Sequence, residues 1–139
     1  MPASLIHILH VEDNHDHAYL IEKGLANHPL NIHLIRLVNG AELLDYLYQR
    51  PPYNDIIKYP QPDLILLDMR LPKVSGMQVL QTIQTEDALS QIPVIALSTS
   101  YQKNAIPNGD NFFYLVKPDN IEQITTELGH LISHCLTKT

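Results

Sequence analysis

Residues 64–72 constrain the fold most strongly, because four consecutive apolar residues there end at a single carboxylate, Asp68. A short continuous apolar run behind turn-forming prolines is typical of a strand buried on both faces, as in a parallel sheet. A carboxylate inside such a core would cost several kcal/mol unless it were paired or bound to a metal. At the carboxyl end of a parallel strand, however, it lies where open α/β sheets bind ligands. Asp68 is therefore predicted either to open the following turn or to act in a crevice.

The composition is that of one globular domain. The 139 residues fit a single domain, 1–139, with no output domain. The net charge of −6 argues against a sequence-independent nucleic-acid binder and against binding to an anionic membrane surface. Cys135 is the only cysteine, so no intrachain disulfide can form. Because we also find no signal peptide and no apolar run long enough to cross a bilayer, we expect a cytoplasmic protein.

Apolar segments alternate with segments of helical periodicity along the chain. Strands are predicted over residues 5–11, 31–38, 94–97 and 112–116, in addition to the run that ends at Asp68. Helices are predicted from Asn14 or Asp16 to about residue 27, over 41–49 and 76–87, and from about 119 to 136. Between the last two strands, Pro107 and Gly109 predict a fourth helix that is short or irregular.

This alternation predicts a flavodoxin-like, doubly wound (βα)5 fold of the α/β class. Its parallel sheet would have five strands in the order 2-1-3-4-5, with helices on both faces. Residues 50–62 contain too many prolines for regular structure and are predicted to form a long ordered loop. Four tyrosines are expected to pack this loop down or to form a partner-binding patch: Tyr46, Tyr48, Tyr53 and Tyr59.

Polar residues follow four of the predicted strands. They are Glu12 and Asp13, then Asp68, then Ser98 and Thr99, and finally Lys117, which Pro118 follows. Because the carboxyl ends of parallel strands meet at one edge, three carboxylates, a hydroxyl and an ammonium are expected to converge. Carboxylates about 4–6 Å apart repel by about 1–4 kcal/mol per pair, and a divalent cation removes that cost. Oxygen ligands suit Mg²⁺, and a carboxylate can attack phosphorus to form an acyl phosphate, so the pattern predicts phosphoryl chemistry.

The same residues resemble the receiver domain of two-component response regulators. The matching segments are 11–14, 66–72 with Gly76, 93–99 and 114–118. The resemblance spans essentially the whole chain. It is closer to small stand-alone receivers, including those paired with bacterial phytochromes.

The resemblance implies a role for each residue at this edge. Asp68 would be the phosphoacceptor. Mg²⁺ would be held by Asp13 directly, by Glu12 through water, by Asp68, and by the backbone carbonyl of Arg70. The phosphate-binding and switch residues would be Ser98, Thr99, Lys117 and Tyr114, and the bond before Pro118 would be a candidate cis peptide.

The resemblance implies a stand-alone response regulator. Its partners would be a sensor histidine kinase or phosphotransfer protein and an unknown output protein, and it would act as a monomer or homodimer, not on nucleic acid or membrane. Two alternatives stay open. An adaptor acting without phosphorylation would fit the shortened fourth helix. A Mg²⁺-dependent phosphohydrolase with an aspartyl nucleophile would usually carry a second Asp where Arg70 stands. Arg70 itself would either screen the phosphoryl group from water or be a solvated surface residue.

The histidines of the two close pairs are predicted to be surface or partly buried polar residues rather than metal ligands. Neither close pair, His15 with His17 or His130 with His134, has a third ligand at a suitable spacing. His7 and His10 interrupt the first strand and are predicted to be buried, neutral imidazoles bonded to the backbone.

Overall fold

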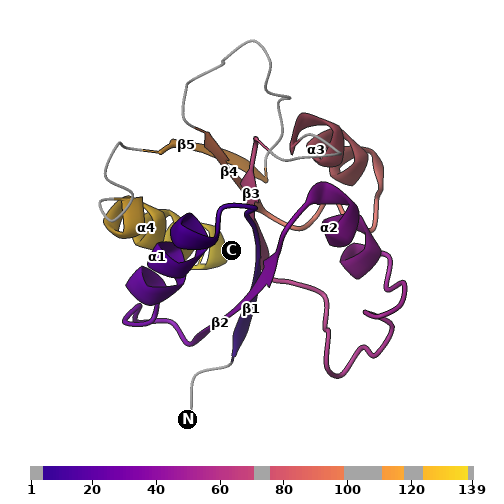
Figure 1. The fold of residues 1–139 in the computed structure, drawn as a ribbon, viewed down its shortest axis with the longest axis horizontal. Helices are drawn as coiled ribbons and strands as arrows, with labels where there is room; N and C mark the ends of the chain where they lie inside the picture. The colour runs from indigo at the N-terminus through magenta and orange to yellow at the C-terminus, as the bar shows by residue number, and fades with distance from the viewer. Residues whose placement is uncertain (1–4, 71–75, 99–110, 118–123, 138–139) are drawn as a thin grey trace.

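The computed structural model describes residues 5–70, 76–98, 111–117 and 124–137, which form an α/β fold (Figure 1). Five parallel strands make one sheet in the order β2-β1-β3-β4-β5, which confirms the predicted order. The strands are β1 (Ile6–Val11), β2 (Ile32–Leu37), β3 (Leu64–Asp68), β4 (Val94–Ser98) and β5 (Phe112–Val116). The helices are α1 (His15–Leu25), α2 (Gly40–Leu47), α3 (Gly76–Thr85) and α4 (Ile124–Thr137).

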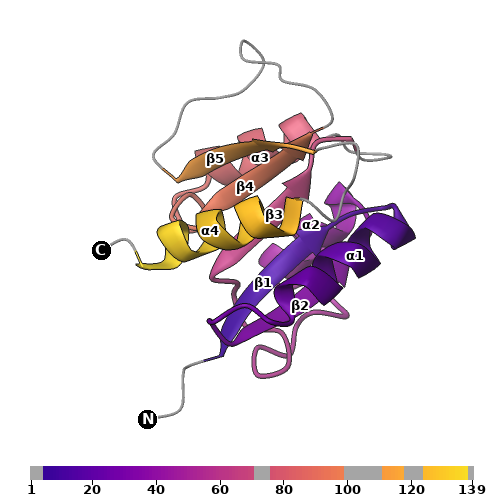
Figure 2. The same cartoon turned by 90° about the vertical axis from the view of Figure 1, so that its left-hand side faces the viewer.

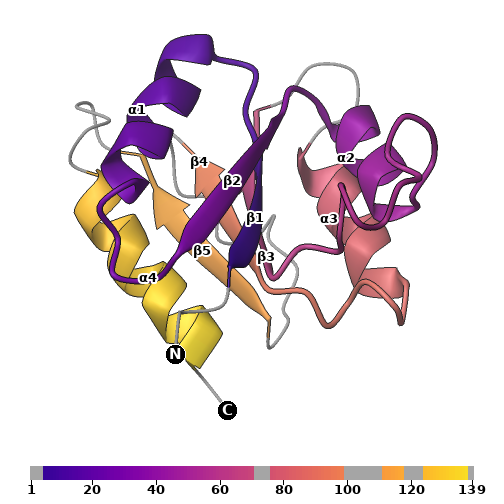
Figure 3. The same ribbon diagram turned by 90° about the horizontal axis from the view of Figure 1, so that it is seen from below.

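Helices cover both faces of the sheet. Figure 3 shows the sheet between one layer made of α1 and α4 and another made of α2 and α3. Figure 2 shows α1 and α4 lying across the same face. Successive strand residues point to opposite faces, so Ile8 packs in the core under α1 and α4, and Leu9 packs under α2 and α3. Every residue of β3 is buried, as expected for the central strand of a sheet covered on both sides.

Asparagine side chains fix the starts of α1 and α2. Asn14 has extended backbone geometry, and its Oδ1 accepts a hydrogen bond from the backbone N–H of His17 at 3.1 Å. Asn39 caps α2 in the same way, through the N–H of Glu42 at 2.8 Å. Each cap satisfies one of the unpaired N–H groups of a first helical turn. Of the two candidate caps for α1, Asn14 is the one used, and α1 therefore begins at His15, two residues after Asp13.

The proline-rich segment 50–62 is an ordered loop at the end of α2, as predicted. Tyr46 is fully buried on α2, and its hydroxyl donates to the carbonyl of Pro60 at 2.8 Å. The Tyr46 and Tyr59 rings each pack against Tyr53, with centroids 5.1 Å apart in both pairs. The fourth tyrosine, Tyr48, is outside this aromatic cluster, 37% exposed, and donates to Glu86 at 3.2 Å.

Two sequence predictions fall partly or wholly outside the described residues. The short or irregular fourth helix was expected within residues 99–110, and the start of the last helix within residues 118–123. The helix labelled α4 corresponds to the predicted last helix and is described from Ile124 onward. Among the described helices, none has both the length and the apolarity needed to cross a membrane.

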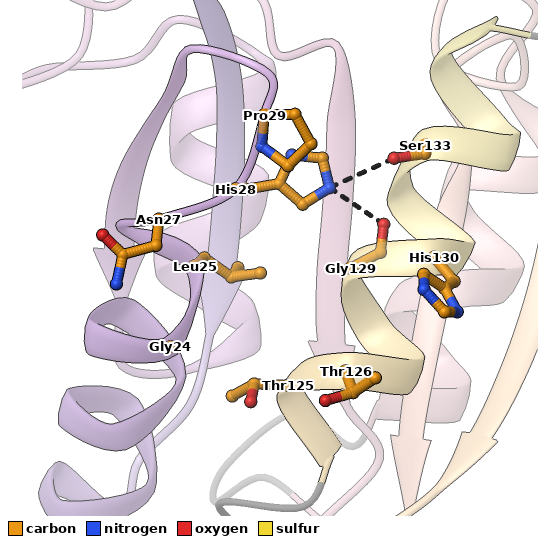
Figure 4. Close-up of a pocket in the computed structure, with 10 residues that line it drawn as sticks. All are labelled: Gly24, Leu25, Asn27, His28, Pro29, Thr125, Thr126, Gly129, His130 and Ser133. Carbon is orange, nitrogen blue, oxygen red and sulfur yellow. Dashed lines mark hydrogen bonds between the residues drawn. The ribbon is translucent and has the colours of Figure 1, made fainter.

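His28 joins the turn after α1 to α4 (Figure 4). Its Nδ1 accepts a hydrogen bond from the N–H of Leu30 at 3.0 Å, which assigns the ring proton to Nε2. Nε2 donates to the carbonyl of Gly129 at 2.9 Å and lies 3.1 Å from the hydroxyl oxygen of Ser133. The contact spans 101 residues of sequence and fixes the first and last described helices to each other.

Candidate functional site

Four polar side chains with little or no exposure lie at the carboxyl edge of the sheet. Glu12 follows β1, Asp68 ends β3, Ser98 ends β4 and Lys117 follows β5, and each is at most 8% exposed. Hydrogen bonds between neighbouring strands hold these ends in place. The N–H of Met69 donates to the carbonyl of Leu97 at 2.9 Å, next to Ser98 in sequence. The predicted convergence at one edge is therefore confirmed for the described residues.

Lys117 bridges two of the carboxylates. Its Nζ donates to Oε1 of Glu12 at 2.8 Å and to Oδ2 of Asp68 at 3.1 Å. The side chains of Lys117, Glu12 and Asp68 are 5%, 0% and 7% exposed, respectively. Charged groups buried to this degree are stable only when they are paired and hydrogen-bonded, and here the ammonium supplies both carboxylates at once. The same ammonium therefore lies directly beside the Asp68 carboxylate.

Three carboxylates form a compact acidic cluster. One oxygen from each of Glu12, Asp13 and Asp68 lies within 4.8 Å of the others. Glu12 and Asp68 are buried, whereas Asp13 is exposed. An all-oxygen donor set of this size suits a hard divalent cation with retained waters. Among the residues that the structure describes, this is the only group of three potential ligands that close together.

A shallow cavity of about 270 Å³ opens onto this cluster. Its lining residues are Glu12, Asp13, Asn14, His17, Asp68, Arg70 and Lys117. The exposed Asp13 and the half-buried His17 come from the start of α1 and its preceding turn, and the exposed Arg70 comes from the turn after β3. A ligand in the cavity would therefore meet the acidic cluster and Lys117 together.

Among the three carboxylates, Glu12 is the one whose pKa is clearly shifted. The pKa of its carboxyl is raised from 4.5 to about 7, chiefly by burial and then by hydrogen bonding with the Asp68 carboxyl. The Lys117 ammonium opposes both effects and keeps the pKa from rising more. One additional contact comes from the backbone N–H of Asn14, which donates to Oε2 of Glu12 at 3.3 Å. A cation that favours the charged carboxylate would act in the same direction as Lys117.

The turn after β3 holds Asp68 through its backbone. The N–H of Arg70 donates to Oδ1 of Asp68 at 2.9 Å, which leaves Oδ2 to Lys117. Gly76, at the start of α3, lies close beneath this turn. A Cβ there would approach the Cα of Met69 to 2.6 Å and the carbonyl oxygen of Asp68 to 2.9 Å, so only glycine fits without displacement. Asp68 thus both opens the turn and faces the cavity, so the two interpretations of the sequence hold together.

Some predicted site residues lie elsewhere. Thr99 and the Lys117–Pro118 bond fall outside the described residues. Tyr114 is half-buried on β5 and lines a second cavity, together with Leu131 and His134 of α4. It is not among the described residues that line the acidic cavity.

Two site neighbours were missed or misjudged from the sequence. His10 is fully buried, but the prediction that it bonds to the backbone is wrong, since both of its ring nitrogens lack a hydrogen-bond partner within the described part of the chain. The same holds for Nδ1 of His7. Arg36, which pairs with His10 across β1 and β2, was not singled out. Its Nε donates to the backbone carbonyl of Glu12 at 3.1 Å, and its guanidinium also contacts His15. The sequence feature that could have indicated its role is a charged residue within a mostly apolar predicted strand.

Fold and site together define a class: flavodoxin-like α/β domains with a carboxylate cluster suited to a divalent cation and a lysine at the carboxyl edge of the sheet. Comparison with known proteins then gives the family. Residues 8–128 match the response regulator receiver domain, and the chain belongs to this family of signalling proteins. It is 32% identical over 120 residues to response regulator Rcp1 of a Synechocystis species, covering 84% of this chain and 80% of Rcp1.

Solved structures agree with this assignment. The phosphorylated cyanobacterial phytochrome response regulator RcpA superposes with a TM-score of 0.83 at 31% identity, covering 98% of this chain and 97% of RcpA. The Mn²⁺-bound form of Rcp1 gives a TM-score of 0.80 at 30% identity, with 96% of each chain covered. The acidic cluster of Glu12, Asp13 and Asp68 is the site at which such a receiver binds a divalent metal and accepts a phosphoryl group.

Proposed function

We propose that this receiver accepts a phosphoryl group on Asp68 from a phosphohistidine of a sensor kinase or phosphotransfer protein. One observation carries the assignment to Asp68: Lys117 donates to Asp68 Oδ2 at 3.1 Å inside the three-carboxylate cluster. Asp13 is exposed and Glu12 is bound more closely by the same lysine, at 2.8 Å. Glu12 and Asp68 both line the cavity, accept from a backbone N–H and contact Lys117. The side chain of Glu12 is 0% exposed and that of Asp68 is 7% exposed, so Asp68 is the lysine-bound carboxylate that a donor can reach.

In the proposed reaction, an oxygen of Asp68 attacks phosphorus and a P–O bond forms. The P–N bond to the donor histidine breaks, and its electron pair returns to the imidazole, which takes up a proton. Negative charge then lies on the phosphoryl oxygens, where the Lys117 ammonium can neutralise part of it. Ser98, buried at the end of β4, supplies a hydroxyl on the same edge of the sheet. Positioning and charge neutralisation, rather than proton transfer, are what these residues contribute.

We propose Mg²⁺ as the metal. Asp13 and Asp68 would hold it directly, Glu12 through water, and the Arg70 carbonyl would complete the set. When bound, the cation polarises the phosphoryl oxygens and neutralises charge that builds up during transfer. The oxygen-only cluster favours a hard cation, and the Mn²⁺ in the Rcp1 structure is a cation of the same charge and ligand preference.

The proposed partners follow from the relatives. Rcp1 and the phytochrome response regulator RcpA support a histidine kinase of the phytochrome type as donor. We propose that phosphorylation moves Ser98 and Tyr114 and so changes which output protein binds. A cytoplasmic setting is consistent with Cys135, which is the only cysteine of the sequence and so cannot form an intrachain disulfide. The phosphohydrolase alternative is not favoured, since Arg70 stands where such enzymes carry a second aspartate.

Phosphorylation by a small donor tests the proposal. The purified chain is incubated with acetyl phosphate and Mg²⁺, and its intact mass is followed over time. We expect a single phosphoryl adduct that is slowly lost, and no adduct without the metal. Rapid turnover of the donor would support the phosphohydrolase, and no adduct at all would support the phosphorylation-independent adaptor.

Two asparagine variants locate the acceptor. Asp68→Asn is expected to abolish the adduct because the amide is a poor nucleophile. Asp87→Asn makes the same chemical change at an exposed position after α3, and is expected to leave uptake unchanged. An adduct that persists in Asp68→Asn would overturn the assignment.

A further inference from the structure

His10 is a buried polar residue that the proposed phosphotransfer does not use. It lies in β1 between Arg36 of β2 and Leu66 of β3, and is 0% exposed. Neither ring nitrogen has a hydrogen-bond partner among the described residues. Buried polar atoms without partners are rare and costly in native proteins, and an apolar side chain would fill the same core position without that cost. The imidazole therefore calls for a functional explanation.

The ring lies beside the acidic cluster. Its Nε2 is 4.0 Å from Oε1 of Glu12, the oxygen that also accepts from Lys117 at 2.8 Å. Burial and the nearby Lys117 ammonium lower the pKa of His10 to about 3, so the ring is neutral. A neutral imidazole keeps one N–H donor and one bare nitrogen. Oε1 of Glu12 thus has one nitrogen in hydrogen-bond contact and a second about 1 Å beyond that range.

Phosphorylation would change which negatively charged groups the Lys117 ammonium contacts. In the unmodified chain its ammonium serves Glu12 and Asp68 together. Once Asp68 carries a phosphoryl group, the negative charge that Lys117 faces lies further out, on the phosphoryl oxygens. Turning toward them withdraws from Oε1 of Glu12 the donor that lies at 2.8 Å in the unmodified chain, and the side chain of Glu12 is 0% exposed. A replacement donor inside the protein would remove this cost.

We propose that His10 is a positioning residue for the phosphorylated state: its Nε2–H moves onto Oε1 of Glu12 when Lys117 turns to the phosphoryl group. This inference rests on the proposed function. In the unmodified chain Nε2 of His10 is 4.0 Å from Oε1 of Glu12 and has no partner among the described residues, which raises the free energy of that state. In the phosphorylated chain it is paired. His10 thereby shifts the equilibrium of the site toward the state in which Lys117 contacts the phosphoryl group.

Substitutions of His10 distinguish a role as hydrogen-bond donor from a role in packing alone. His10→Gln places an amide N–H near the position of Nε2, whereas His10→Leu fills the site without any donor. His7→Leu is the matched control, since His7 lies three residues earlier on β1 and also has an unpartnered ring nitrogen, but is not beside Glu12. Affinity for beryllofluoride, a phosphoryl mimic, is measured in Mg²⁺ together with resistance to urea in the free state.

We expect His10→Leu to be at least as resistant to urea as the native chain, because an unpaired polar group has been removed. Its affinity for beryllofluoride should nevertheless fall about tenfold or more, which corresponds to about 1.4 kcal/mol. His10→Gln should recover most of that affinity, and His7→Leu should keep all of it. Native affinity in His10→Leu would overturn the inference, and so would an equal loss in His10→Leu and His10→Gln. A purely packing role cannot produce a variant that is stable but weakly bound.

A measurement on the native chain covers the case in which a variant fails to fold. Imidazole N–H resonances are recorded by NMR with and without beryllofluoride, and the His10 signal is assigned by its absence in His10→Gln or, if that variant is unfolded, by its contacts to Leu66. We expect the Nε2–H of His10 to become hydrogen-bonded only with the mimic present. An unchanged His10 signal in a chain that binds beryllofluoride would overturn the role of His10 alone. A native chain that takes up neither the mimic nor a phosphoryl group would overturn both proposals.

Discussion

Replacing Glu12 by glutamine should change how the stability of the metal-free chain depends on pH. The pKa of Glu12 is raised from 4.5 to about 7 in the folded chain, first by burial and then by the hydrogen bond to Asp68. Because the folded pKa lies above the unfolded one, the stabilising contribution of Glu12 is fully present below about pH 4.5. It is lost as the pH rises through about 7. Glutamine keeps the shape and an oxygen for Lys117 but does not titrate.

The magnitude follows from the two pKa values. Between about pH 5 and pH 8 the folded chain retains the Glu12 proton over most of the range in which the unfolded chain has lost it. Integrating the difference in bound protons gives about 2–3 kcal/mol of unfolding free energy lost by the native chain. The difference between native and Glu12→Gln stability should therefore shift by about 2–3 kcal/mol across this range, in favour of the variant at high pH.

Urea denaturation with a metal chelator present, at several pH values, measures this shift. Glu22→Gln is the matched control, because Glu22 is exposed on α1, and its difference from the native chain should stay constant within about 0.5 kcal/mol. Divalent metal should reduce the difference at high pH, since it stabilises the ionised carboxylate. A native-minus-variant difference that does not change with pH would refute the account of Glu12 as a buried, proton-retaining carboxyl.

Three further substitutions test other parts of the structure. Tyr46→Phe should cost about 1–2 kcal/mol in urea denaturation, because it leaves the partly buried carbonyl of Pro60 without its donor. Tyr48→Phe, at an exposed hydroxyl, should cost less than about 0.5 kcal/mol, and equal effects would contradict the buried role of Tyr46. Gly76→Ala should lower the free energy of unfolding by roughly 1–3 kcal/mol and slow phosphoryl uptake, because the added methyl group would collide with the backbone carbonyl of Asp68. Native stability and uptake would show that the turn can shift without cost. Arg70→Ala should shorten the lifetime of the acyl phosphate by roughly threefold to tenfold, measured by loss of the adduct mass; an unchanged lifetime would make Arg70 a solvated surface residue.

The fold was predictable because the strands are short and mostly apolar, and β3 and β4 are continuous apolar runs up to Asp68 and Ser98. A run such as the one ending at Asp68 suits only a strand covered on both faces, and the polar residues after each run mark one edge of the sheet. The bounds of elements were less certain, and α3 ends at Thr85 rather than at residue 87. At such ends, tertiary contacts and capping decide between conformations of similar local energy.

The site was predictable to the extent that topology brings strand ends together. Periodicity and spacing place Glu12, Asp68 and Lys117 at one edge, but they do not show which atoms meet. That Lys117 serves both carboxylates at once is a result of side-chain geometry. His10 could not be predicted correctly, because the sequence shows only that a histidine interrupts an apolar strand. Its missing hydrogen bonds depend on the packing around it.

The contact between His28 and α4 has a consequence for synthesis of the chain. Its partners are separated by 101 residues, so a growing polypeptide cannot form it until the last helix has emerged from the ribosome. Until then the apolar stripe of α1, with Ile21 and Leu25, has no α4 residues to cover it. Lys117 is also made after both carboxylates, so the acidic cluster stays without its ammonium until this part of the chain is synthesised. Nascent chains should therefore expose the apolar face of α1 until α4 has emerged, when the helical layer and the charge balance of the site can both be completed.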